Sequence, residues 1–214
     1  MPPVKKTKSL NMLYIHPENP QTRLIKQAAH ALKKGGVICY PTDTVYGIGC
    51  DIYNQKAVKR IHQIKNRAKD KPFSFICADL KDVSIYCNLS NTAYRVMKKA
   101  LPGPYTFVLT AMKVVPKIMM SKQKTVGIRV PANEICRQLV KELGNPLLNT
   151  SALVDEEDSI TDAWQVEEKF GSMLDLVIDG GSIIPSESTV ISMIENEVEV
   201  LREGDGDFDC LNIA

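Results

Sequence analysis

Residues 37–49 read Val-Ile-Cys-Tyr-Pro-Thr-Asp-Thr-Val-Tyr-Gly-Ile-Gly. The run starting at Val37 is apolar without polar alternation, which predicts a short strand, Val37 to Tyr40, buried on both faces. Small hydroxyls, a carboxylate and two glycines follow directly. An open α/β sheet commonly binds its ligand where such a strand ends, and glycine lets a ligand approach the backbone closely. The same residues would also suit a tight turn between a strand and a loop.

Helices and strands alternate on both sides of this stretch. Apolar residues recur at helical spacing over 22–34, and Gly35-Gly36 follows as a typical helix end. Asn54 and Asn133 are suitable N-caps for two further helices. The other expected helices cover 91–101 and 163–170, and the other expected strands cover 13–15, 73–78, 105–111, 125–130, 146–151, 174–178, 190–193 and 198–202. This alternation predicts one α/β domain around a twisted, mixed sheet with flanking helices.

The composition is that of an ordinary soluble globular protein. Hydrophobic residues make up 44% and charged residues 24% of the 214 residues. The net charge of +2 neither demands nor excludes a nucleic acid. The six cysteines form no C-x-x-C pair, which favours reduced, mostly buried thiols in the cytoplasm over a disulfide framework or a zinc site.

The chain ends suggest short tails around a single folded unit. The N-terminus is basic but lacks the apolar segment of a secretory signal, and no apolar run is long enough to span a bilayer. We therefore expect a flexible tail over 1–12, a domain over 13–207 and a second tail over 208–214, with no membrane association.

Cations gather in residues 65–72, Lys-Asn-Arg-Ala-Lys-Asp-Lys-Pro. Pro72 disfavours helix at Lys71, so a helix entering this stretch should stop and release Lys65, Arg67 and Lys71 into a loop. Arginine supplies a planar fork and lysine a point charge, a combination suited to a polyphosphate. A solvated basic turn after an amphipathic helix is the alternative interpretation.

Several familiar catalytic motifs are absent from the sequence. There is no G-x-x-x-x-G-K-[ST], no G-x-G-x-x-G and no G-x-S-x-G, and the three histidines lie far apart without metal-binding spacing. No metal site is therefore expected. The chemistry should depend on holding anions and orienting reactants rather than on a protein nucleophile.

The motifs together resemble the YrdC family. The resemblance extends over nearly the whole chain from Leu13 onward and rests mainly on P-T-D-T-V-Y-G at 41–47 and K-x-R-x-x-x-K-P at 65–72. Supporting matches are P-G-P-Y-T at 102–106, T-V-G-I-R-V-P at 125–131, T-S-A at 150–152, S-T-V-I at 188–191 and R-E-G at 202–204.

The resemblance implies a YrdC-like α/β fold with a large basic cavity. It also implies synthesis of L-threonylcarbamoyl-AMP from L-threonine, bicarbonate and ATP, with release of pyrophosphate. This is the first step of N6-threonylcarbamoyladenosine formation at position 37 of tRNA, which a downstream threonylcarbamoyl transferase complex continues. Mg2+ would arrive with ATP rather than in a protein site.

The same resemblance assigns roles to individual residues. It implies that Arg67 and Lys71 contact the ATP phosphates, with Lys65 beside them, so that these three cations form the catalytic set. The remaining ATP contacts would come from Thr106, Ser151 and Arg202, and the threonine contacts from Thr44, Arg129 and Ser188.

Departures from the family pattern leave a second function open. The family usually reads Ser-Ala-Asn where this chain has Ser151-Ala152-Leu153, and Ser192 stands where Asp is common. Residues 14–20, Tyr-Ile-His-Pro-Glu-Asn-Pro, look more like the YciO branch, although that branch typically lacks the complete Lys65, Arg67 and Lys71 set retained here. A YciO-like protein that binds double-stranded RNA or tRNA without catalysis is the alternative.

Overall fold

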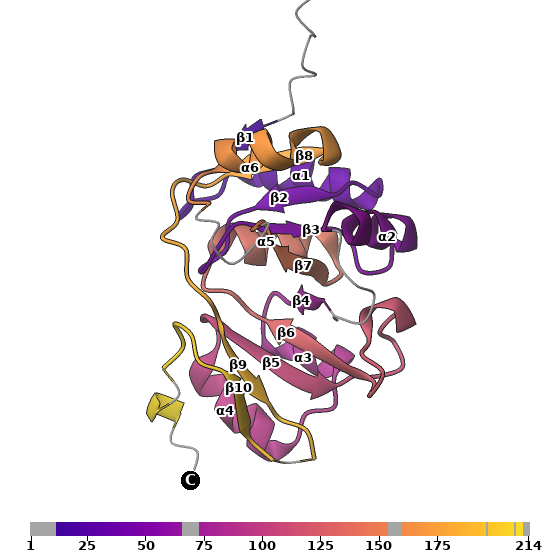
Figure 1. Ribbon diagram of the computed structural model, residues 1–214, viewed down its shortest axis with the longest axis vertical. Coiled ribbons are helices and arrows are strands. Elements are labelled where there is room, and N and C mark those ends of the chain that lie inside the picture. The colour runs from indigo at the N-terminus through magenta and orange to yellow at the C-terminus, as the bar shows by residue number, and fades with distance from the viewer. Residues whose placement is uncertain (1–11, 66–72, 154–159, 196, 208, 212–214) are drawn as a thin grey trace, which may run out of the picture.

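The computed structural model describes residues 12–65, 73–153, 160–195, 197–207 and 209–211. Its strands form one mixed sheet in the order β1-β8-β2-β3-β7-β4-β6-β5-β9-β10 (Figure 1). The strands are β1 Met12–Tyr14, β2 Ile38–Tyr40, β3 Gly47–Gly49, β4 Ser74–Ile76, β5 Tyr105–Thr110, β6 Thr125–Arg129, β7 Leu147–Ser151, β8 Leu176–Asp179, β9 Thr189–Ser192 and β10 Glu199–Arg202. The predicted α/β domain with a mixed sheet and flanking helices is confirmed.

Helices cover both faces of this sheet. They are α1 Thr22–Lys33, α2 Gln55–Ile64, α3 Leu80–Tyr86, α4 Asn91–Ala100, α5 Glu134–Leu143 and α6 Ala163–Phe170, with short 3-10 turns η1 Lys117–Met119, η2 Gly171–Met173 and η3 Asp209–Leu211. The buried sides of α1 and α5 share one apolar cluster, whereas α2, α3, α4 and α6 contribute to the other. Strand β2 lies between the two clusters, because Ile38 packs into the first and Cys39 into the second.

The observed elements follow the sequence patterns closely, with two exceptions. Asn54 and Asn133 cap α2 and α5 as predicted, accepting hydrogen bonds from Ala57 N at 3.0 Å and Cys136 N at 3.1 Å. Strand β3 and helix α3 were not predicted. Both are short, with three and seven residues, so neither contains enough repeats of a side-chain period to reveal itself.

The described cysteines are free and buried, as the composition predicts. Burial raises the pKa of each of these thiols, to about 12 for Cys87, so they remain protonated at neutral pH. Among the helices of the described residues, none combines the length and the apolarity that crossing a membrane requires.

Strands β2 and β3 form an antiparallel hairpin whose tight packing depends on glycine. A Cβ atom at Gly49 would lie 2.1 Å from the carbonyl oxygen of Leu148 in the backbone of β7, a clash that no rotamer change can relieve. We expect Gly49→Ala to lower the free energy of unfolding by about 1–3 kcal/mol in urea denaturation. Gly127→Ala is the matched control, because its Cβ would be 3.3 Å from its nearest neighbours and should cost less. Equal losses in the two variants would contradict this explanation.

Candidate functional site

A cavity of about 390 Å³ lies at the ends and edges of the central strands. This volume falls within the range of small-molecule sites. Its polar lining comes from the 42–45 turn, from β4, β5, β6, β7 and β10, and from the segment that enters β9. Apolar side chains complete the wall, namely Val45, Phe73, Val108, Val126, Leu153 and Val190. The cavity therefore offers hydroxyl and guanidinium groups on one part of its surface and apolar contact on another.

The turn at 42–45 holds its threonines rigidly. The hydroxyl of Thr42 accepts hydrogen bonds from the backbone N–H groups of Thr44 and Val45, both at 3.1 Å, and donates to the carbonyl oxygen of Val45 at 2.5 Å. Serine and threonine commonly close turns with such local bonds. Cys136 supports the turn from α5, since its Sγ lies 2.9 Å from the carbonyl oxygen of Pro41. The predicted ligand residue Thr44 is thus buried and fixed at the cavity wall.

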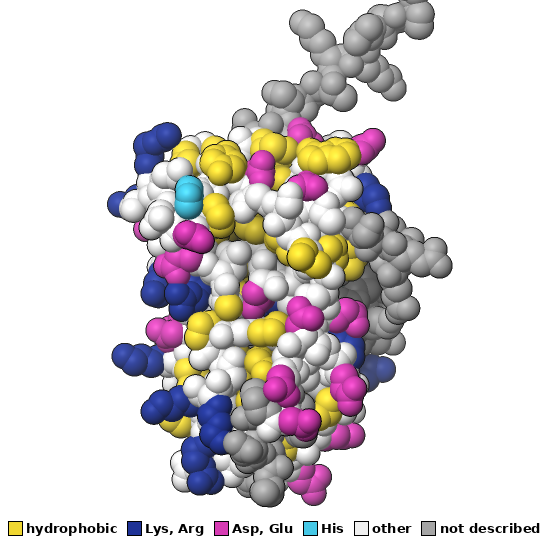
Figure 2. Space-filling model, turned by 90° about the vertical axis from the view of Figure 1, so that its left-hand side faces the viewer, with side chains coloured by type: hydrophobic (Ala, Val, Ile, Leu, Met, Phe, Trp, Pro, Cys, Tyr) yellow, Lys and Arg dark blue, Asp and Glu magenta, His cyan; other side chains and the backbone are white. Residues whose placement is uncertain are grey.

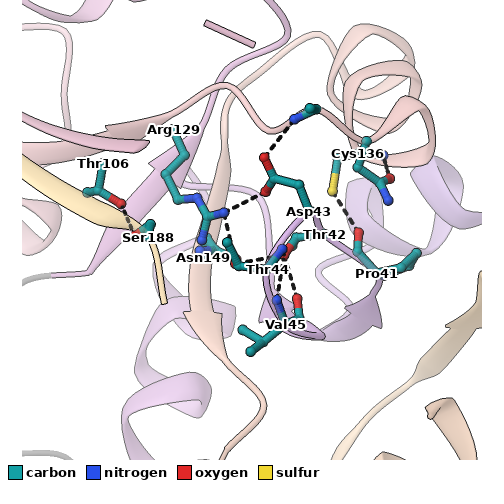
Figure 3. A network of polar contacts seen from close by, with 12 residues as sticks. Pro41, Thr42, Asp43, Thr44, Val45, Thr106, Arg129, Cys136, Asn149 and Ser188 are labelled. Carbon is teal, nitrogen blue, oxygen red and sulfur yellow. Dashed lines mark hydrogen bonds and ion pairs between the residues drawn. The ribbon is translucent and has the colours of Figure 1, made fainter. Parts of the chain in front are cut away.

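Arg129 and Asp43 form a buried ion pair beside this turn. The Arg129 Nη2 donates to Asp43 Oδ1 at 2.7 Å and to Thr44 Oγ1 at 3.0 Å (Figure 3). The other Asp43 oxygen accepts from Ala132 N at 2.8 Å. The two side chains are only 6% and 8% exposed. The sequence placed Arg129 in the site but did not identify Asp43 as its partner. The Asp43 carboxylate neutralises the charge of Arg129.

A second polar cluster joins β5, β10 and the residue that precedes β9. The hydroxyls of Thr106 and Ser188 lie 2.8 Å apart, and Arg202 Nη2 donates to the carbonyl oxygen and the hydroxyl of Ser188 at 2.9 and 3.2 Å. Arg202 also pairs with Glu187 at 2.9 Å in an exposed contact. Three predicted site residues are therefore brought together, although their polar groups already bond one another. In Figure 3, Arg129 lies between this cluster and the 42–45 turn.

Lys65 follows the last residue of α2, as the sequence predicts. Its ammonium group donates to the carbonyl oxygens of Ser151, at 3.1 Å, and Leu153, and lies 5.8 Å from the centre of the Phe170 ring. These contacts tie α2 to the end of β7, where Ser151 and Leu153 line the cavity. Arg67 and Lys71, the other members of the predicted cationic set, lie outside the described residues.

Asn149 is a cavity residue that the sequence analysis did not select. Its side-chain oxygen accepts from the Tyr40 hydroxyl at 2.9 Å, and its amide nitrogen donates to Ser74 Oγ at 3.3 Å. A Cβ at Gly47 would approach the Asn149 oxygen to 2.7 Å, so the glycine leaves room for this contact. The position of Asn149 near the end of a buried strand could have indicated a role in the site, but the residue belongs to none of the family motifs found in the sequence.

The described residues contain no group of three or more His, Cys, Asp or Glu side chains arranged to hold a metal ion. The polar groups of the described cavity wall are mainly hydroxyl, amide and guanidinium groups, which suit an anionic ligand better than a bare cation.

The fold and the cavity together define an α/β domain with a partly polar cavity at strand ends. The profile of the Sua5/YciO/YrdC family, described as "Telomere recombination", matches residues 30–204. The chain belongs to this family.

Relatives on two branches of the family resemble the chain over most of its length. A protein from Escherichia coli named YciO is 41% identical over 196 residues, covering 91% of this chain and 95% of the relative. A threonylcarbamoyl-AMP synthase from Idiomarina loihiensis is 34% identical over 178 residues, covering 80% of this chain and 95% of the relative.

Solved structures confirm the fold. The crystal structure of E. coli YciO gives a TM-score of 0.87 at 40% identity and covers 92% of this chain and 97% of that one. The crystal structure of Pyrococcus abyssi Sua5 complexed with L-threonine gives a TM-score of 0.84 at 33% identity, covering 90% of this chain and 57% of that one. The predicted family resemblance is therefore confirmed.

Proposed function

We propose that this protein is an L-threonylcarbamoyl-AMP synthase that uses L-threonine, bicarbonate and ATP and releases pyrophosphate. The observation that carries the proposal is the cavity, whose buried Arg129 and Thr44 are joined in one network at the wall. Relatives named threonylcarbamoyl-AMP synthase and a family structure complexed with L-threonine support this choice of reaction.

The reaction chiefly needs charge neutralisation and positioning. The amine of threonine first attacks bicarbonate to give a carbamate and water, and a carbamate oxygen then attacks the α-phosphate of ATP and displaces pyrophosphate. Attacker and leaving group are both anionic, so positive charge near the triphosphate lowers the barrier more than a protein base would. In this proposal Arg67 and Lys71 neutralise the phosphates, and Mg2+ accompanies ATP.

The remaining contacts divide between the two substrates. Thr44, Arg129 and Ser188 would hold threonine, whereas Thr106, Ser151 and Arg202 would complete the ATP site. Lys65 would act beside the phosphates while its bonds to Ser151 and Leu153 hold the cavity wall. The buried, protonated thiols favour a cytoplasmic protein, whose product a threonylcarbamoyl transferase complex would place on tRNA.

A radiolabelled assay tests the proposal directly. The purified chain is incubated with ATP, Mg2+, bicarbonate and labelled L-threonine, and both pyrophosphate and the labelled adenylate are measured. The proposal requires that product formation depend on threonine and on bicarbonate. Tight RNA binding with a steep salt dependence and no turnover would instead support the RNA-binding alternative. On the face in Figure 2, Lys and Arg side chains are most frequent along the left edge, and carboxylates are scattered among uncharged and hydrophobic groups over the rest.

Leu153 should limit the rate of this reaction. Its side chain lines the cavity where the family usually carries asparagine, so a polar contact to the substrates is missing. We expect Leu153→Asn to increase the rate of adenylate formation about tenfold. This factor corresponds to the free energy of one hydrogen bond to a charged group. Leu153→Ala is the matched control, because it removes the same apolar side chain without adding an amide. An equal rate increase in both variants would show that space, rather than the amide, matters.

A further inference from the structure

Two polar atoms at the cavity are buried without a hydrogen-bond partner. Within the part of the chain that the structure describes, they are Arg129 Nε and Ser186 Oγ. Both residues line the cavity. A buried donor without an acceptor costs free energy, so native proteins rarely keep one unless a ligand, an ion or water satisfies it. Ser186 belongs to none of the family motifs in the sequence and has no role in the function proposed above.

Thr44 connects these two unsatisfied groups. The backbone N–H of Ser186 donates to the carbonyl oxygen of Thr44 at 3.1 Å. Arg129 Nη2 donates to the Thr44 hydroxyl at 3.0 Å. The unpartnered atoms thus belong to two residues that are each bonded to the same threonine, on the wall of the same cavity. Both residues therefore flank Thr44 at the cavity wall, and each still has a polar atom that needs an acceptor.

The chemistry of the pair limits what this acceptor can be. An arginine Nε can only donate, and a serine hydroxyl can donate as well, so the complementary group is an oxygen with free lone pairs. Asp43 already neutralises the charge of Arg129, so a polyphosphate gains little extra attraction here. A singly charged, planar carboxylate matches two donors and a nearly neutral surrounding better. The Ser188 hydroxyl is less available, since it already bonds Thr106 and Arg202.

We propose that Ser186 is a ligand-binding residue and that its hydroxyl, together with Arg129 Nε, binds a carboxylate oxygen of the substrate. The inference rests on the proposed function only for the source of that oxygen, which would be the α-carboxylate of the amino acid or bicarbonate, a planar anion with equivalent acceptor oxygens. Ser186 contributes affinity for the carboxylate and is not required for the fold.

Isothermal titration calorimetry of the full chain with L-threonine, bicarbonate and inorganic phosphate as separate probes tests this proposal. Ser186→Ala should weaken binding of one carboxylate probe about tenfold, whereas Ser186→Thr, which keeps the hydroxyl, should largely restore it. Ser172→Ala controls for loss of an exposed serine elsewhere. A loss confined to L-threonine or to bicarbonate supports the proposal and identifies the source. A loss confined to phosphate, or unchanged binding of all three probes, overturns it.

Thermal unfolding without ligand separates binding from a structural role. Ser186→Ala removes an unsatisfied hydroxyl, so the melting temperature should stay unchanged or rise. Ser188→Ala should lower it, because this variant breaks contacts to Thr106 and Arg202. Equal destabilisation by both substitutions would overturn the proposal. The binding assay does not depend on turnover. If the chain binds a carboxylate through Ser186 but releases no pyrophosphate, the proposed reaction is refuted and the proposed role of Ser186 still stands.

Discussion

Arg129→Leu is expected to lower the free energy of unfolding by about 3–5 kcal/mol, the usual consequence of removing one member of a buried ion pair. The substitution leaves the Asp43 carboxylate, only 8% exposed, without the guanidinium that lies 2.7 Å away. It also removes the donor to Thr44 and so loosens the turn at the cavity. Urea denaturation at pH 7, followed by circular dichroism, measures the loss.

Two companion variants separate charge from geometry. Asp43→Asn combined with Arg129→Leu removes both charges and should recover much of the stability lost in the single variant. Arg129→Lys keeps the charge but not the planar fork, so it should retain more of the stability while losing affinity for the substrate carboxylate. An Arg129→Leu protein as stable as the parent would mean that the buried pair contributes nothing, contrary to this explanation.

The fold could be predicted largely because its long elements have clear side-chain periods and caps. Helix α6 spans the predicted residues 163–170, and α5 begins and ends as Asn133 and Gly144 indicate. Gly144 adopts a left-handed backbone conformation with φ of 82°, the geometry that makes glycine a common helix end. Strand β3 was missed because Gly47-Ile48-Gly49 has low intrinsic strand preference, and its pairing with β2 and β7 determines its structure instead.

The candidate site could be predicted only as a set of residues, without their partners. The motifs identified Thr44 and Arg129, but their contact joins positions 85 residues apart, and no local pattern reveals such pairing. Asp43 likewise reads as a ligand-facing carboxylate, whereas the fold directs it to Arg129. Lys65 was predicted to lie beside phosphates. The residues adjacent to it in the sequence do not indicate its bonds to the end of β7. Long-range contacts of this kind follow from strand order, which the sequence alone did not supply.

The largest loss of activity should follow substitution of the cations in residues 65–72. We expect Arg67→Ala and Lys71→Ala each to reduce pyrophosphate release by roughly 100- to 1,000-fold, the range seen when one preorganised group that stabilises transition-state charge is removed. The reason is electrostatic, because the carbamate and the triphosphate repel each other until cations neutralise them. Steady-state assays with saturating threonine and bicarbonate measure the loss, and circular dichroism verifies that each variant is folded.

Lys69→Ala provides a matched control within the same segment. It removes an equal charge between Arg67 and Lys71 but occupies a variable position of the K-x-R-x-x-x-K-P pattern. If the pattern reflects specific contacts with phosphate oxygens, Lys69→Ala should retain most of the activity and show an unchanged KM for ATP. If the segment acts only through its total charge, all three variants should lose activity equally. Raising the ionic strength should then also lower the activity of the parent protein. Equal losses would therefore reject the assignment of Arg67 and Lys71 as individual phosphate ligands, even in a chain that catalyses the proposed reaction.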